Sequence, residues 1–305
     1  MMTKPMQNKH LEHPEDCILT GDLSVLDWFS EVESTISVKM DGAPALVWGT
    51  NPANGKFFVG TKSVFNKVKI KINHSHEEID ANHEGKVADI LHAAFDCLPR
   101  TKSIIQGDFL GFSGSDTYCP NTITYVFPQV IRQDIIIAPH TIYSGGDDLR
   151  EVSAAPLTSK LKSTKKCLFV QPEVELNPFR EDLEDVCKFA KQMSTLCEFV
   201  SERKASQIKK ELNACIREQK VVDENEIAEK CDCDKYLISL WKLVKSIKDD
   251  LFLFIHELDE IECFIGDEMS FHEGYVIRNK FGTYKIVDRE TFSHANFTIE
   301  KNWIK

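Results

Sequence analysis

The segment Ser37-Val-Lys-Met-Asp-Gly-Ala-Pro44 places a lysine, a carboxylate and a glycine in close succession. Residues 35–50 around it are rich in small and β-branched types, which are typical of strands. Lys39 therefore lies at the end of a predicted strand, and Asp41 and Gly42 form the turn that follows. On its own, the pattern is equally compatible with a solvated lysine beside an ordinary Asp-Gly turn.

Strand and turn patterns continue on both sides of this segment. Further strands are predicted at residues 56–59, 67–72, 104–112, 121–137 and 271–287. Residues 51–55 have the composition of a turn, as do residues 280–283 within the last of these runs. Residues 77–98 are predicted to be helical.

Residues 179–262 differ from the rest of the chain because they are free of glycine and proline. Their apolar residues recur at helical spacing, as at Leu183, Val186 and Ala190. The chain is thus β-rich, then helical, then β-rich again. We expect an α+β fold in which residues 1–174 and 265–305 form one sheet domain and residues 175–264 form a helical insertion.

Composition narrows the classes of protein that the chain can belong to. The 305 residues carry a formal net charge of −11, which argues against coating nucleic acid through overall positive charge. The N-terminus is too polar for a secretory signal and no apolar run is long enough to span a membrane, so we expect a cytoplasmic protein. The ten cysteines are then expected to be reduced, and Cys231-Asp-Cys233 lacks the spacing of a zinc site.

Four further segments place charged or aromatic residues on predicted strands. They are Gln106-Gly-Asp-Phe-Leu-Gly111, Thr124-Tyr-Val-Phe127, His272-Glu-Gly-Tyr-Val-Ile-Arg278 and Tyr284-Lys-Ile-Val287. Each has an ordinary interpretation by itself: a turn carboxylate, core aromatics or an exposed strand charge. Their order along the chain is much less easily produced by chance.

This ordered set resembles the covalent nucleotidyltransferase superfamily, which contains ATP-dependent DNA ligases, RNA ligases and mRNA capping enzymes. It is most similar to phage-type RNA ligases, in which a Lys-x-Asp/His-Gly lysine, a Gly-Glu-Phe/Leu box, a Tyr-Val-Phe strand, Glu-Gly-Tyr-Val and Lys-x-Lys follow one another. The resemblance covers residues 36–137 and 271–287. It implies the ligase adenylation-domain fold of antiparallel sheets, interrupted here by the helical segment. If the protein is from a phage, we expect it in the cytoplasm of the host cell.

The resemblance also implies a catalytic centre. Lys39 would attack the α-phosphorus of ATP to form lysyl-AMP, and Asp41 and Gly42 of the same motif would help to bind the nucleotide. Lys285 would lie against the α-phosphate, and Glu273 would bind Mg²⁺ or Mn²⁺. A lysine attacks only as the neutral amine, and burial and neighbouring cations lower a lysine pKa, so we expect such surroundings at Lys39.

Three more residues would contact the nucleotide or the metal by the same resemblance. Asp108 takes the position that contacts the ribose, and it is a second candidate metal ligand. Phe127 takes the position that stacks on adenine, with a core aromatic as the alternative. Lys62 stands where relatives carry an arginine that touches the nucleotide or a 5′-phosphate, although a lysine lacks the bidentate fork of arginine.

Three features depart from the family pattern. The usual Lys-x-Lys is Lys285-Ile-Val287 here, so one cation is missing; either Lys280 or Lys301 replaces it, or the adenylation step is weakened. Asp108 and Glu273 are farther apart in sequence than is usual, which the helical insertion accounts for. The stretch after Lys285 is too short for the oligonucleotide-binding barrel that follows the core in DNA ligases and capping enzymes, and this favours an RNA-ligase type of enzyme or a diverged member that acts on another substrate.

The expected function is ATP-dependent joining of 5′-phosphate to 3′-hydroxyl ends of a nucleic acid, RNA more than DNA. Two clusters of lysines, at 56, 62, 67, 69 and 71 and at 160, 162, 165 and 166, either bind a phosphate backbone or form a solvated face.

The helical segment is a candidate for binding RNA or a protein partner, or it only covers the sheet. Alternatives are nucleotide transfer to a protein or an RNA cap, and a degenerate ligase fold kept as a binding module. His74-x-His76 is a weak candidate for a transition-metal pair.

Overall fold

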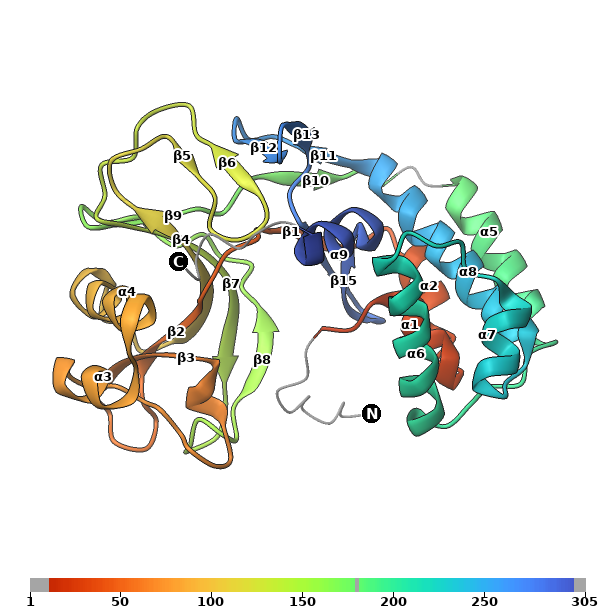
Figure 1. The fold of residues 1–305 in the computed structure, drawn as a ribbon, viewed down its shortest axis with the longest axis horizontal. Coiled ribbons are helices and arrows are strands. Elements are labelled where there is room, and N and C mark those ends of the chain that lie inside the picture. The colour runs from red at the N-terminus through yellow and green to blue at the C-terminus, as the bar shows by residue number, and fades with distance from the viewer. Residues whose placement is uncertain (1–10, 179–180, 299–305) are drawn as a thin grey trace.

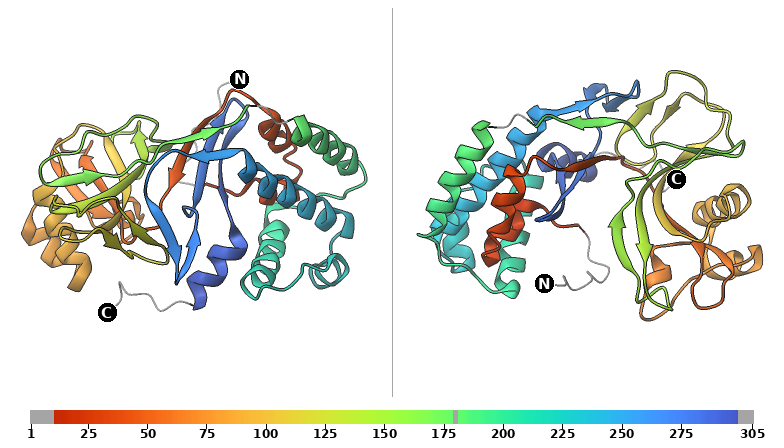
Figure 2. Two further views of the ribbon diagram at one scale, coloured as in Figure 1. Left: turned by 90° about the horizontal axis from the view of Figure 1, so that it is seen from above. Right: turned by 180° about the vertical axis from the view of Figure 1, so that it is seen from behind.

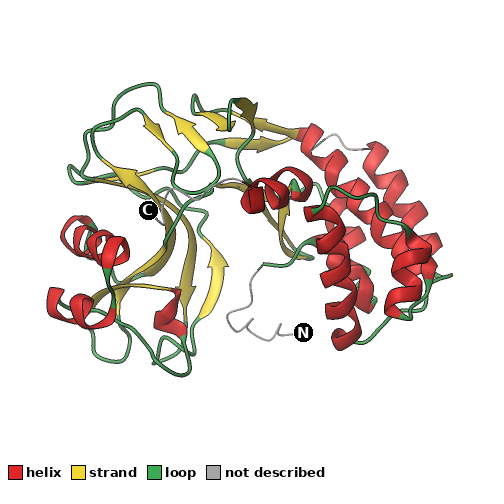
Figure 3. Ribbon diagram, viewed as in Figure 1, coloured by secondary structure: helices red, strands yellow, loops and turns green. Residues whose placement is uncertain are grey.

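The computed structural model describes residues 11–178 and 181–298, which form a mixed α and β fold with mainly antiparallel sheets. Most strands gather at one end of the molecule and most helices at the other, as Figure 3 shows. The expectation of an α+β fold is therefore confirmed at this level. Within the described residues, no helix is both long and apolar enough to cross a membrane.

The largest sheet has the strand order β3-β2-β4-β7-β8, with β9 added beside β7. All of its pairs are antiparallel except β7 with β9. Its strands are β2 (Ala45–Thr50), β3 (Phe57–Thr61), β4 (Ile104–Phe112), β7 (Ile135–Ser144), β8 (Ser153–Pro156) and β9 (Cys167–Phe169). The helices α3 (His76–Asn82) and α4 (Gly85–Cys97) cover the side of this sheet away from the helical region (Figure 1).

The packing between α4 and this sheet is apolar. Leu91 and Ala94 on α4 are fully buried in one cluster with Trp48 of β2 and Ile105 of β4. Burial of each large apolar side chain contributes roughly 1.5–3 kcal/mol, so this layer holds the sheet rigid beneath the helices.

A three-stranded sheet runs β1-β14-β15 and comprises β1 (Thr35–Lys39), β14 (Gly274–Asn279) and β15 (Gly282–Val287). Lys39 pairs with Gly274, and Gly274 pairs with Val287 on the other side. A side chain at position 274 would place its Cβ 2.2 Å from the Ile286 carbonyl oxygen, so only glycine fits there. The predicted hairpin turn between β14 and β15 is confirmed.

Two small sheets link these parts along one side of the molecule (Figure 2). One has the order β13-β12-β6-β5 and the other pairs β10 with β11. Their strands are β5 (Thr117–Tyr118), β6 (Thr124–Val126), β10 (Val174–Leu176), β11 (Ile255–Glu257), β12 (Glu262–Ile265) and β13 (Glu268–Ser270). β10 and β11 thus bring together the chain before and after the helical segment.

The helical segment contains α5 (Glu181–Ser194), α6 (Glu202–Arg217), α7 (Glu224–Cys231) and α8 (Lys235–Leu251). Side chains cap three of these helices: Ser201, Asp223 and Asp234 each accept hydrogen bonds from backbone N–H groups in the first turn that follows. The N-terminal helices α1 (Pro14–Cys17) and α2 (Ser24–Ser30) and the C-terminal α9 (Arg289–Thr298) pack against them.

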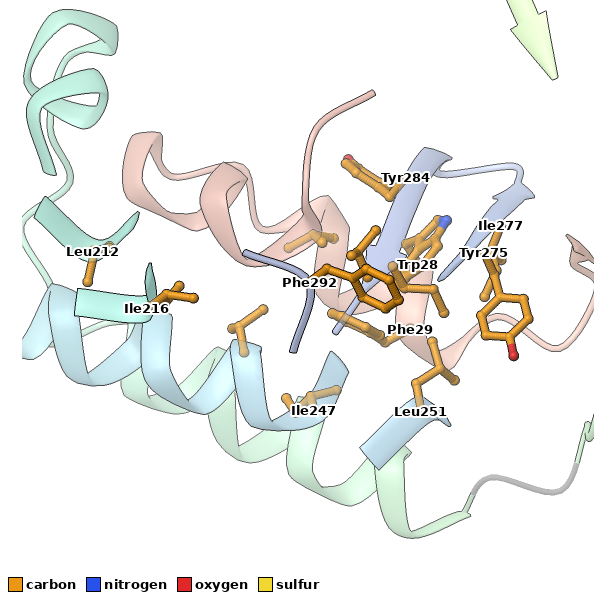
Figure 4. Packing of buried hydrophobic residues seen from close by; sticks show 14 of the residues in the cluster. Trp28, Phe29, Leu212, Ile216, Ile247, Leu251, Tyr275, Ile277, Tyr284 and Phe292 are labelled. Atoms are coloured by element: carbon orange, nitrogen blue, oxygen red, sulfur yellow. The ribbon is translucent and has the colours of Figure 1, made fainter. Parts of the chain in front are cut away.

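These helices and the three-stranded sheet share one hydrophobic core. Trp28 and Phe29 of α2 lie between Tyr284 of β15 and Ile247 of α8 (Figure 4). Trp28 meets Tyr284 edge to face, with ring centroids 5.1 Å apart. The N-terminal residues therefore join the helices to the sheet that carries Lys39.

Three local predictions differ from the structure. Residues 67–72 are not a strand but an irregular segment after the short helix at Lys62–Phe65, with Val68 78% exposed and Lys69 at a positive φ of 56°. The helix predicted over residues 77–98 is two helices, broken at residues 83–84. Between β6 and β7, much of the strand predicted over residues 121–137 is loop. All ten cysteines are free, as expected.

Candidate active site

Lys39 ends β1, and its ammonium forms an ion pair with the carboxylate of Glu273. Lys39 is opposite Gly274 in the sheet, so the residue just before β14 is brought to the end of β1. The side chains of Lys39 and Glu273 are 26% and 19% exposed, so the pair is sheltered but open to water. Residues 234 positions apart in sequence thus meet at the first predicted site residue.

The turn after Lys39 packs directly on β4. A Cβ at Gly42 would lie 2.8 Å from the Phe109 carbonyl oxygen and 2.9 Å from Cβ of Asp108. Hydrogen bonds on either side hold this contact, from the Ala43 N–H to Phe109 O and from the Phe109 N–H to Pro44 O, both 3.1 Å. The glycine of the motif is therefore required by the close approach that places Asp108 beside the turn.

Asp41 anchors a second loop to the same turn. Its carboxylate accepts hydrogen bonds from the Asn121 side chain at 2.8 Å and from the Thr122 N–H at 2.7 Å. The Asp41 N–H in turn donates to the hydroxyl of Tyr125, which is fully buried on β6. Because its oxygens are already bonded, Asp41 fixes the site and is a poor candidate for contact with a substrate.

Asp108 lies on β4 and is 8% exposed. His140 on the neighbouring strand β7 approaches its carboxylate at 3.5 Å. Burial opposes ionisation of Asp108, but His140, Lys39 and Lys62 together outweigh burial and lower the pKa of the carboxyl group. Lys62 itself is exposed at the start of the short helix after β3, so it stands at the rim of the site.

The two lysines of the site have opposite pKa shifts. Burial and the nearby charge of Lys39 lower the pKa of Lys285, which shares a face of the three-stranded sheet with Lys39. For Lys39, burial acts to lower the pKa, but Glu273 and Asp108 outweigh it and raise the pKa. The prediction that its surroundings hold Lys39 neutral is therefore wrong for this state, because carboxylates surround the amine more closely than cations do.

Glu273 is a carboxylate whose ionisation its surroundings oppose. Its pKa is raised, first by burial and then by Asp41 and Asp108, although Lys39 acts in the opposite direction. A further cation nearby would favour the ionised form of Glu273. In the part of the chain that the structure describes, no three His, Cys, Asp or Glu side chains are grouped to hold a metal ion. Mg²⁺ commonly uses only one or two carboxylates together with phosphates and water, and Glu273 and Asp108 fit that arrangement.

Comparison with known protein families gives a single result for this chain. A family model matches it in two overlapping segments, residues 8–233 and 188–301. The chain belongs to DUF6267, a family of unknown function. No curated protein and no solved structure matches it.

In this DUF6267 chain, Phe127 is buried and follows directly after β6. It packs edge to face on Tyr118, with ring centroids 5.8 Å apart, and lines a pocket of about 850 Å³ formed with residues 128–133, 168–172 and 261. Its stacking on adenine stays a prediction. The aromatic residue of β6 that contacts the Lys39 turn is Tyr125.

Lys280, one of the two proposed replacements for the missing lysine, is not found at this DUF6267 site. Lys280 lies in the β14–β15 turn, 68% exposed, and pairs with Glu31. Lys301 is outside the described residues. Val287 itself lies across Gly274 from Lys39, and its carbonyl oxygen accepts a hydrogen bond at 3.2 Å from the buried ammonium of Lys248 on α8.

Sequence reasoning missed three residues that shape this site: Asn121, Tyr125 and His140. Tyr125 belongs to the aromatic segment at residues 124–127, in which the family pattern indicates a role only for Phe127. His140 gives no local signal, because its contact with Asp108 depends on the pairing of β4 with β7. To predict such contacts, one must know which strands pair, and no sequence motif indicates that pairing.

Proposed function

We propose that this chain is an ATP-dependent polynucleotide ligase of RNA-ligase type, built on a ligase adenylation-domain fold and working through lysyl-AMP on Lys39. One observation carries the proposal. Lys39, Asp108, Glu273 and Lys285 come from four separate segments, and they act on one another within a single sheltered cluster. Their order in the sequence and their meeting in space are independent features.

The first step is attack of the Lys39 amine on the α-phosphorus of ATP. A bond forms between Nζ and phosphorus, the bond to the leaving pyrophosphate breaks, and the nitrogen releases one proton to water, to which the Lys39 side chain is open. Lys285 supports this step as a cation against the α-phosphate. Bound Mg²⁺ would offset negative charge on the triphosphate and the leaving pyrophosphate.

The resting ion pair sets a condition on this chemistry. Lys39 is held charged mainly by Glu273 and Asp108, so it becomes a nucleophile only when those carboxylates are engaged elsewhere. Glu273 and Asp108 are the residues that would hold Mg²⁺ and the ribose. Occupation of the site would thus lower the pKa of Lys39 at the moment when a neutral amine is needed.

In the later steps, AMP passes from Lys39 to the 5′-phosphate of a nucleic acid, and a 3′-hydroxyl then displaces AMP to join the strands. Lys62 at the rim is placed to meet an incoming phosphate. Lys67 and Lys69 lie on the irregular segment that follows the Lys62 helix. A basic strip of this kind suits a phosphate backbone on an otherwise acidic protein.

A second candidate function is a degenerate ligase fold that binds a nucleic acid or a partner without catalysis. Val287 in place of the second lysine favours it, as does the charged state of Lys39. Transfer of a nucleotide to another acceptor, a protein or an RNA cap, would use the same first step.

Nucleotide labelling separates these functions. Purified protein is incubated with ATP or GTP labelled at the α-phosphate, with Mg²⁺ or Mn²⁺, and the labelled residue is mapped. Label from ATP on Lys39, lost in Lys39→Ala and retained in the control Lys280→Ala, supports the ligase, and transfer to 5′-phosphorylated RNA or DNA distinguishes the substrate. Label from GTP would favour capping, and no label from either nucleotide with retained RNA binding would favour the binding module.

A further inference from the structure

Two histidines on the helices that cover the large sheet face each other outside the proposed active site. His76 begins α3 and His92 lies in α4, and their Nδ1 atoms are 2.6 Å apart. Their ring centroids are 4.9 Å apart, and the ring planes are inclined by only 18°. The distance between the centroids exceeds the distance between the two Nδ1 atoms by about one ring diameter. The rings therefore lie side by side, nearly in one plane, with the two Nδ1 atoms aimed at each other.

A carboxylate lies behind each ring. Nε2 of His76 is 3.1 Å from Asp96, and Nε2 of His92 is 2.8 Å from Asp80. An ionised carboxylate only accepts hydrogen bonds, so both Nε2 atoms must carry the proton. In two neutral rings, each Nδ1 then presents a lone pair to the other, and the contact is repulsive unless a cation lies between them.

We propose that His76 and His92 form a binding site for a divalent transition-metal ion such as Zn²⁺, Ni²⁺ or Cu²⁺. Both imidazole nitrogens are good ligands for these ions, and a carboxylate that holds the opposite ring nitrogen is the usual support of a metal-bound histidine. At metal–nitrogen distances of about 2.0–2.1 Å, two tetrahedral ligands are about 3.3 Å apart, so on binding the rings must separate and turn until both Nδ1 lone pairs point at the ion. Water completes the coordination, because the side chains are 44% and 29% exposed.

The bound ion would cross-link α3 and α4 and has no part in the chemistry at Lys39. The pairing also corrects the candidate His74-x-His76. His74 turns instead to Glu78, with its Nδ1 3.0 Å from that carboxylate, and only His76 belongs to the proposed pair. His74 is therefore a matched control, a histidine two residues from a proposed ligand and held by its own acid.

The test is calorimetric titration of the purified full chain with Zn²⁺, Ni²⁺ and Cu²⁺, alongside the melting temperature with and without the metal. We expect one ion per chain, a higher melting temperature with metal, and at least a tenfold loss of affinity in His76→Ala and in His92→Ala. Asp80→Asn and Asp96→Asn should each weaken binding about 10–100-fold while leaving both ligands in place. His74→Ala should bind as wild type does.

Two results would overturn the site. One is the absence of binding to folded wild type at micromolar metal, in which case a proton shared by the two rings accounts for the contact. The other is binding that persists unchanged in His92→Ala. Neither result bears on nucleotide labelling at Lys39.

Discussion

Two clusters of sheltered charge lie in this molecule, one around Lys39 and the other beneath α1, and they differ in how open they are to water. In the cluster beneath α1, Lys248 and Arg289 reach Glu15 at 3.0 and 2.8 Å, and Arg289 also reaches Asp16 at 3.0 Å. The indole N–H of Trp241 donates a further hydrogen bond to Asp16. None of these four charged side chains is more than 6% exposed.

The cluster around Lys39 is the more open of the two, because the side chains of Lys39 and Glu273 are 26% and 19% exposed. Each cluster contains one carboxylate with a lowered pKa, Asp108 in one and Glu15 in the other. Each also contains one whose pKa is raised first by burial, Glu273 in one and Asp16 in the other. The difference therefore lies in access for a ligand, and it favours the Lys39 cluster as the functional one.

The largest expected effect is the loss of Lys248. Lys248→Met leaves Glu15 buried with one cation fewer, and we expect the free energy of unfolding to fall by about 3–5 kcal/mol, the usual result of breaking a buried pair. Urea denaturation followed by circular dichroism measures it. Lys235→Met, an exposed lysine on the same helix, should change stability by less than about 0.5 kcal/mol. Equal effects of the two variants would mean that the cluster beneath α1 does not hold the helices together.

The pH dependence of stability should distinguish Glu15 from Glu273 by its sign. Burial opposes ionisation of Glu15, but Lys248 and Arg289 outweigh it and lower the pKa from 4.5 to about 2. This contribution, roughly 3 kcal/mol, is complete above about pH 4.5 and is lost as the pH falls toward 2. Glu273 has a raised pKa, so its ionised form costs stability at neutral pH, and protonation relieves that cost as the pH falls through its folded-state pKa.

Urea unfolding of wild type, Glu15→Gln and Glu273→Gln between pH 7 and pH 3 tests this contrast. The deficit of Glu15→Gln relative to wild type should shrink as the pH falls. The difference between Glu273→Gln and wild type should move in the opposite direction. Parallel curves for the two variants would contradict the opposite pKa shifts of Glu15 and Glu273.

Gly42→Ala should have an intermediate effect. The added methyl group meets the Phe109 carbonyl oxygen at 2.8 Å, and we expect a loss of about 1–3 kcal/mol as the turn moves off β4. Labelling from ATP should fall with it, because Asp108 is then no longer held beside Lys39. The matched control is Gly55→Ala, whose Cβ meets nothing within 4 Å but whose φ of 71° carries its own strain. If Gly42→Ala loses stability but keeps its labelling, the packing of the turn on β4 is not needed for the reaction at Lys39.

Lys39→Met should have the smallest effect on stability, about 1 kcal/mol or less, because its ion pair is partly open to water. The same variant should lose all label from ATP. Thermal or urea unfolding and the labelling assay measure the two effects on one sample. A stability loss as large as that of Lys248→Met would make Lys39 a structural residue.

Much of the fold can be predicted from the sequence because it depends on local patterns. The strand at residues 104–112, the β14–β15 hairpin and the helical segment all follow from the alternation or periodicity of their apolar residues. The run at residues 67–72 has the same alternation, but it finds no neighbouring strand and remains irregular. Periodicity indicates which faces are apolar and does not indicate whether a partner strand is available.

From the sequence, the candidate site can be predicted only through the residues at strand ends and the order of the motifs. Lys39 and Glu273 meet because β1 and β14 are adjacent, which the family pattern anticipated. The pKa of Lys39 depends on how many carboxylates surround the amine, and Asp108 reaches it from a different sheet. Such a count cannot be read from spacing along the chain.

The crossing of the chain from β1 to β2 has a mechanical consequence. Lys39, Glu273 and Lys285 are attached to the three-stranded sheet, whereas Asp108 and His140 are attached to the six-stranded one, and residues 40–44 form the joint between them. Small rotations about this joint would bring a carboxylate toward the amine or withdraw it. The protonation state of Lys39 would therefore depend on the angle between the three-stranded and the six-stranded sheet.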